Sequence, residues 1–167
     1  GGTCTLRAAL MEVNVLTGCS PLTIDFSVSG NIELATALPE INHPNLIIDG
    51  PGADQLTVKR STADGTPDFR IFTIPGGKTV EISGLTITNG KMPASAGGAG
   101  IRNYGTLSLD DMIITGNHAD QSGAGGIHNR GQLTIDNTTI SNNTAGTDAG
   151  ILTSFESVTI RNSNFSG

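Results

Sequence analysis

Apolar and polar residues alternate over short stretches of the chain, and the alternation recurs at a nearly constant distance. Val80, Leu107, Leu133 and Val158 each begin an apolar–polar–apolar triplet, and successive triplets lie 25 to 27 residues apart. A period of two residues indicates a β-strand with one buried face. Two further short strands per repeat are predicted at matching places, by Ile87, Ile114, Ile140 and Phe165 and by the Gly-Ile pairs at 100–101, 126–127 and 150–151.

A repeat of this length predicts a stacked fold. Periods of 20 to 50 residues are typical of solenoids, propellers and arrays. About 25 residues with three short strands are too few for a propeller blade, and no helical pattern interrupts the units. We therefore expect an all-β, three-sided parallel β-helix whose rungs stack roughly 4.8 Å apart. Asn103 and Asn129 lie 26 residues apart and predict a ladder of side-chain amides along the stack.

The first half of the chain carries the same pattern more loosely. Short strands are predicted at 22–26, 31–34, 45–50, 55–58 and 70–74, separated by clusters of turn residues. We count about six rungs, which corresponds to a rod roughly 30 Å long. The expected organisation is a single domain over 1–167, with a capping segment at 1–20 and rungs at 21–167.

The N-terminal segment follows a different period. Leu6, Ala9, Leu10 and Val13 form the apolar stripe of a short amphipathic helix, whose start Thr5 or Thr3 could cap. We expect this helix to cap the solenoid by covering the apolar interior of the first rung.

Cys4 and Cys19 stand at the two ends of the predicted helix. A zinc site needs about four ligands at characteristic spacing, and no such set accompanies them. We favour a disulfide, which implies an oxidising compartment and would stabilise the fold by roughly 3 kcal/mol. The alternative is a pair of buried, unbonded thiols.

Charge and composition exclude several kinds of partner. The net charge is −6, and no stretch of clustered Lys or Arg appears, so we expect no nucleic-acid partner. No apolar run approaches the roughly 18 residues of a membrane-spanning helix. Aromatic residues are only 4% of the chain and Trp is absent, so platforms for stacking sugars are scarce.

Several segments resemble one known group of proteins. "CTLRAALMEVN" resembles the Cys-Ser-Leu-Arg-Glu-Ala-Ile motif that opens many bacterial secreted right-handed β-helix proteins, and "GAGIRNYGTLSLDDMIITGN" is similar to their rungs and to the repeats of polymorphic outer-membrane proteins. The resemblance implies a right-handed, pectate-lyase-like β-helix, export, and residence at or beyond the cell surface. One position departs from the motif: Ala8 stands where its capping box has Glu, three residues after Thr5.

The candidate chemistry is a row of acids. Asp110 and Asp136 occupy the same place after consecutive predicted strands, where Ser83 and Arg161 stand in the flanking rungs. Two carboxylates roughly 5 Å apart could hold Ca²⁺ or act as an acid–base pair, with Arg161 beside them. The competing interpretation, which we favour, is a solvated row whose repulsion Arg161 relieves.

Motifs of pectin-degrading enzymes are missing from the chain. A polygalacturonase-like site requires Gly-His-Gly and Arg-x-Lys beside clustered Asp, and here only Asp110-Asp111 occurs. His118 and His128 lie in different turn regions, where we expect both to be exposed.

These observations favour a non-enzymatic, secreted or cell-surface module of structural or adhesion type, without a cofactor other than the candidate Ca²⁺. We expect it to associate end to end into a fibre or to form part of a longer rod, because an open strand edge recruits another strand. A glycan or a host surface is the expected external partner. The competing hypothesis is a carbohydrate-active enzyme or glycan-binding domain acting on acidic polysaccharide.

Overall fold

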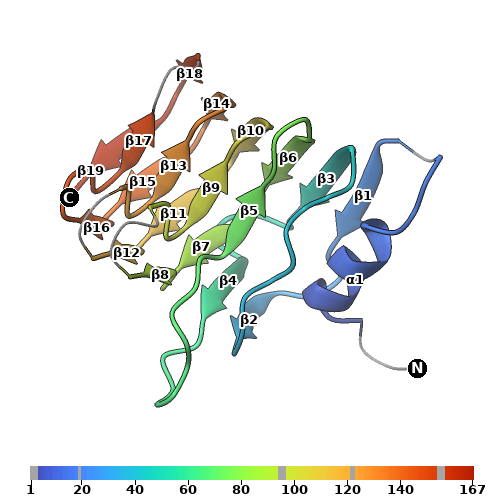
Figure 1. Ribbon diagram of the computed structural model, residues 1–167, viewed down its shortest axis with the longest axis horizontal. Helices are drawn as coiled ribbons and strands as arrows, with labels where there is room; N and C mark the ends of the chain where they lie inside the picture. Colours follow the sequence, from blue (N-terminus) through green and yellow to red (C-terminus); the bar gives the residue numbers. More distant parts are fainter. Residues whose placement is uncertain (1–3, 19, 94–96, 121–122, 154–156) are drawn as a thin grey trace.

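A computed structural model shows that the chain winds into a parallel β-solenoid (Figure 1). The structure describes residues 4–18, 20–93, 97–120, 123–153 and 157–167. Two of its sheets have six strands each, which corresponds to about five turns between the first strand and the last. The short N-terminal helix lies at one end of the stack and the C-terminal strands lie at the other (Figure 1).

In the described part of the chain, four parallel sheets run along the stack, and successive strands of a sheet come from successive turns. The first sheet contains β1 (Leu22–Asp25), β3 (Asn45–Asp49), β6 (Thr79–Ser83), β10 (Thr106–Asp110), β14 (Gln132–Asp136) and β18 (Val158–Ile160). The second contains β2 (Gly30–Leu34), β4 (Leu56–Arg60), β7 (Thr86–Thr88), β11 (Ile113–Thr115), β15 (Thr139–Ser141) and β19 (Asn164–Ser166). The third contains β5 (Phe72–Ile74), β9 (Ile101–Asn103), β13 (Ile127–Asn129) and β17 (Ile151–Thr153).

The fourth sheet was not predicted from the sequence. It consists of β8 (Lys91–Met92), β12 (His118–Ala119) and β16 (Thr144–Ala145). Strands of two residues are too short to show an alternation, so nothing in their composition separates them from turns. The five strands expected in the first half all form, with bounds shifted by at most two residues.

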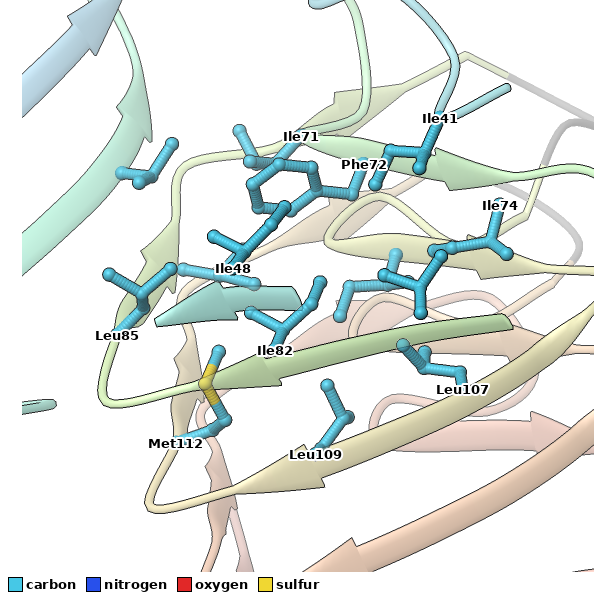
Figure 2. Close-up of a cluster of buried hydrophobic side chains, with 14 of the residues drawn as sticks. Ile41, Ile48, Ile71, Phe72, Ile74, Ile82, Leu85, Leu107, Leu109 and Met112 are labelled. Carbon is cyan, nitrogen blue, oxygen red and sulfur yellow. The ribbon is translucent and has the colours of Figure 1, made fainter. Parts of the chain in front are cut away.

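The register aligns the apolar triplets along the stack. Val80, Leu107, Leu133 and Val158 pair in succession across β6, β10, β14 and β18. The first three are buried in one hydrophobic core that runs through the solenoid, and the half-buried Val158 packs against it. Figure 2 shows part of this core, where Ile82 and Leu109 point inward from neighbouring strands. No turn could bury this face alone, so the stack as a whole is the stable unit.

Helix α1 (Leu6–Val13) forms over the predicted apolar stripe and begins as the sequence indicates. The Thr5 side chain caps the helix by accepting a hydrogen bond from the Ala8 backbone N–H at 3.2 Å. Leu6, Leu10 and Val13 are buried in the same core as the strands. The helix therefore extends the core beyond the first coil.

Two polar side chains fasten α1 to the coil that follows it. The Arg7 guanidinium donates to the carbonyl oxygens of Thr36 and Ala37 at 2.7 and 2.6 Å. The Asn14 carboxamide donates to the Glu40 carbonyl oxygen, and its oxygen accepts the backbone N–H of Asn42 at 2.8 Å. These bonds hold α1 to the loop between β2 and β3.

Close contact between coils makes several glycines intolerant of a side chain, and Gly131 is one of them. A Cβ at Gly131 would overlap the carbonyl oxygen of Gly105 one coil below, whereas a Cβ at Gly76 would lie 3.7 Å from its nearest neighbour, the Tyr104 carbonyl oxygen. We expect Gly131→Ala to lower the free energy of unfolding by about 1–3 kcal/mol. Gly76→Ala is the matched control and should stay within about 0.5 kcal/mol. Equal urea midpoints for the two variants would contradict this packing.

Candidate functional site

The acidic row is a hydrogen-bonded corner of the solenoid. Asp110 and Asp136 pair across β10 and β14. The Asn137 amide donates to Asp110 Oδ1 at 2.7 Å, and the Asn162 amide donates to Asp136 Oδ1 at 3.1 Å. Arg161 Nη1 lies 3.9 Å from Asp136 Oδ2. Each carboxylate is therefore held by the asparagine that lies one coil further along.

The same corner continues toward the N-terminal end of the stack. Ser83 pairs with both Asp49 and Asp110, and its hydroxyl donates to Asp49 Oδ1 at 2.8 Å. From Ser83 onward, the residue after the corner position has a positive φ, in succession Gly84, Asp111, Asn137 and Asn162. Asn and Asp tolerate this left-handed conformation better than most residues, which accounts for their presence here. Among the described residues, no group of three or more His, Cys, Asp or Glu side chains could hold a metal ion.

Buried asparagines form two ladders between coils. The Asn103 amide donates to Asn129 Oδ1 at 2.7 Å, and both residues are fully buried. The Asn117 amide donates to Asn143 Oδ1 at 2.9 Å in the same manner. Asn117 and Asn143 lie 26 residues apart, which equals the spacing of the first pair, although they were not predicted to form a ladder. Matched spacing was the signal for this second ladder.

The predicted disulfide is not found among the described residues. The Cys4 thiol is free and exposed, and Cys19 lies outside the described residues. Cys4 precedes the helix cap at Thr5, where its side chain faces solvent instead of the core. The helix is held by Arg7 and Asn14 instead.

The sequence did not predict a cationic patch, which lies on the outer face of the third sheet. Its members are Arg102, Tyr104, His128 and Arg130. Arg102 and His128 pair across β9 and β13, so they project from consecutive coils. The Arg102 guanidinium lies 4.6 Å from the centroid of the Tyr104 ring, and its Nη2 donates to the Tyr104 hydroxyl.

The expectation that both turn histidines are exposed is half wrong. His118 is exposed, and its ring nitrogens lie 2.6 Å from Thr144 Oγ1 and 2.7 Å from Asp120 Oδ1. His128 is half-buried, and neither of its ring nitrogens has a hydrogen-bond partner among the described residues. The backbone of Gly97 and Gly98 lies against His128 and removes it in part from water.

Burial lowers the pKa of His128 below its ordinary value, and the positive charges of Arg130, Arg102 and Arg70 lower it further. The Gly97 backbone opposes this shift. Arg70 lies close to Arg102, and its pKa is lowered to about 10 by burial and by that like charge. The patch is thus a site of concentrated positive potential on an acidic protein.

The lowered pKa of His128 makes stability depend on pH. The unfolded state binds a proton near the ordinary pKa of about 6.5, and the folded state binds it only at lower pH. The contribution of His128 to the free energy of unfolding is therefore complete above about pH 6.5. It is lost as the pH falls below that value. We expect the loss of Tm between pH 7.5 and pH 5.5 to be smaller in His128→Gln than in the wild type, as measured by thermal unfolding. Equal losses in the two proteins would contradict the shift.

The fold and these ladders define a class, the parallel β-solenoids. The family described as "Right handed beta helix region" matches residues 46–167, and the chain belongs to this family. Neither the curated proteins nor the solved structures provide a match to the chain. Within the part of the chain that the structure describes, no helix is both long and apolar enough to span a membrane.

Proposed function

We propose that this protein is an extracellular or cell-surface structural module of adhesion type, a rod that associates end to end. The observation that carries the proposal is the location of the exposed large apolar side chains. Met11, Val15, Leu16 and Val28 lie at the helix end of the stack, and Ile160 and Phe165 lie in its last coil. Such side chains are absent from the sides of the described solenoid. An apolar patch at each end is typical of surfaces that contact another molecule.

The two ends differ in structure, which determines how copies would join. At one end, helix α1 covers the first coil and exposes Met11, and Leu16 is exposed just after the helix. In the last coil of this sequence, Ile160 and Phe165 are 47% and 42% exposed. A contact between unlike ends leaves an open end on each new copy, and repetition of that contact yields a filament.

Polar groups on the sides of the stack support the structural role. Asp110 Oδ1 and Asp136 Oδ1 each accept a hydrogen bond from an asparagine of the next coil, so one oxygen of each carboxylate joins coils. A general acid or base must reach the proton of a substrate. A carboxylate hydrogen-bonded in this way instead stabilises the corner of the solenoid. The resemblance of the N-terminal motif to exported proteins supports the extracellular location.

The association is tested by sedimentation of the purified chain. We expect the mean mass of the wild type to rise with concentration, and Phe165→Ser and Leu16→Ser each to abolish that rise. Ile113→Ser makes a similar change on the side of the stack and should leave the association unchanged. A mixture of the Phe165 and Leu16 variants retains one intact contact and should form a 1:1 complex. A wild type that stays monomeric at all concentrations would overturn the proposal.

The competing enzymatic function is tested separately. We expect no cleavage when the chain is incubated with acidic polysaccharides in the presence and absence of Ca²⁺. Cleavage that disappears in Asp110→Ala and persists in Asn164→Ala would assign catalysis to the acidic row and contradict the structural role.

A further inference from the structure

The cationic patch has the organisation of a binding site that the structural role does not require. β9 supplies Arg102 and is followed by Tyr104, while β13 supplies His128 and is followed by Arg130. The Arg130 backbone N–H donates to the Asn103 carbonyl oxygen, which places Arg130 one coil beyond Tyr104. The four side chains therefore form a two-by-two array on adjacent coils, roughly 4.8 Å apart along the stack.

The charges of this array are not balanced by carboxylates. Elsewhere, four cations form ion pairs with acids, namely Lys59, Arg60, Lys91 and Arg161, and Arg7 instead donates to backbone carbonyl oxygens. Within the described residues, neither Arg102 nor Arg130 forms an ion pair, although the chain has a net charge of −6. Positive groups that lie together without acids repel one another, and a bound anion would relieve that repulsion.

Hydrogen-bonding groups at the array also lack partners. Arg102 Nε and both ring nitrogens of His128 are buried and make no hydrogen bond within the described part of the chain. Buried polar groups in proteins are nearly always bonded, so each exception requires an explanation. The unbonded nitrogens of Arg102 and His128 lie next to the exposed Arg130, which indicates that a hydrogen-bond acceptor binds at this array.

We propose that Arg102, Tyr104, His128 and Arg130 form a binding site for an oxyanion, a carboxylate or a sulfate group. A guanidinium presents its N–H groups as a planar fork that matches the two oxygens of such a group. Two arginines on adjacent coils place two forks side by side, and the Tyr104 ring orients one of them. The site goes beyond the proposed structural role and does not depend on it.

Binding is measured by calorimetry at low ionic strength with three probes: sodium sulfate, sodium acetate and an oligogalacturonate. Sodium chloride at equal ionic strength is the control for non-specific screening. Binding of sulfate or acetate would identify a small free anion as the ligand. Binding of the oligogalacturonate alone, or at least tenfold more tightly, would identify acid groups carried on a chain of sugars.

Two variants and one control locate the site. We expect Arg130→Gln and Arg102→Gln each to raise the Kd at least tenfold, and Arg161→Gln, which removes the same charge at the corner row, to change it less than twofold. Arg130 is exposed, so its variant should fold even if Arg102→Gln does not. A saturating probe should also raise the pKa of His128, observed by NMR, because the anion offsets Arg70, Arg102 and Arg130. Absence of binding for all three probes, or an equal loss in Arg161→Gln, would overturn the proposal.

Discussion

Asn117→Ala is expected to lower the free energy of unfolding by roughly 3 kcal/mol, because several buried groups lose their only side-chain partner. Asn117 Oδ1 accepts the Gly90 backbone N–H at 2.9 Å, and its amide donates to the Ile87 carbonyl oxygen at 3.2 Å. The same amide bonds Asn143 in the next coil. All of these groups are shielded from water, so none can exchange its lost bond for solvent.

The control for this effect is Asn164→Ala in β19. The Asn164 side chain is exposed, and the change should alter stability by less than about 0.5 kcal/mol. Urea unfolding followed by circular dichroism gives both values. A loss below about 1 kcal/mol at Asn117 would show that the ladder is dispensable, since that is the contribution of one ordinary hydrogen bond.

Phe72→Ala should be the most damaging single truncation of the core, with an expected loss of about 3–5 kcal/mol. Phe72 is 1% exposed, and its ring occupies the interior beside aliphatic side chains from several strands (Figure 2). Alanine would leave a cavity there, because neighbouring coils are held in register by their ladders and can collapse only in part.

The control for Phe72→Ala is the same substitution at an exposed phenylalanine, which removes the same atoms without leaving a cavity in the core. Phe165→Ala in the last coil should lose less than about 1 kcal/mol when measured at concentrations where the chain is monomeric. If Phe72→Ala does not fold, Phe72→Leu retains most of the volume and should show an intermediate loss. Similar unfolding midpoints for the Phe72→Ala and Phe165→Ala variants would contradict the burial described here.

The fold could be predicted because the solenoid is nearly one-dimensional. Each strand pairs with the strand one turn later. The number of residues between Leu107 and Leu133 is therefore the length of one turn, and the two residues lie side by side in the sheet. The helix was predictable for a similar reason, since Leu6, Leu10 and Val13 lie within two turns of one element. Local periodicity carries this information without knowledge of distant contacts.

The candidate site was harder to predict. Asp110 and Asp136 were correctly placed in one row, but the part played by Asn137 and Asn162 depends on side-chain directions at a left-handed corner. The cationic patch was not predicted although Arg102 and His128 have the ladder spacing of 26 residues, because its basic residues are not clustered along the sequence.

The sequence alone determined the solenoid, its register and its capping helix, because each follows from spacing along the chain. Only the tertiary structure decided which polar residues are removed from water. Asn117 and His128 lie in stretches whose composition is typical of turns. Neighbouring coils nevertheless bury the first fully and the second in part. Arg70 lies 32 residues before Arg102, outside the repeat spacing, and only the folded chain brings the two charges together. Burial and electrostatic interaction depend on what packs from other coils, which no local pattern contains.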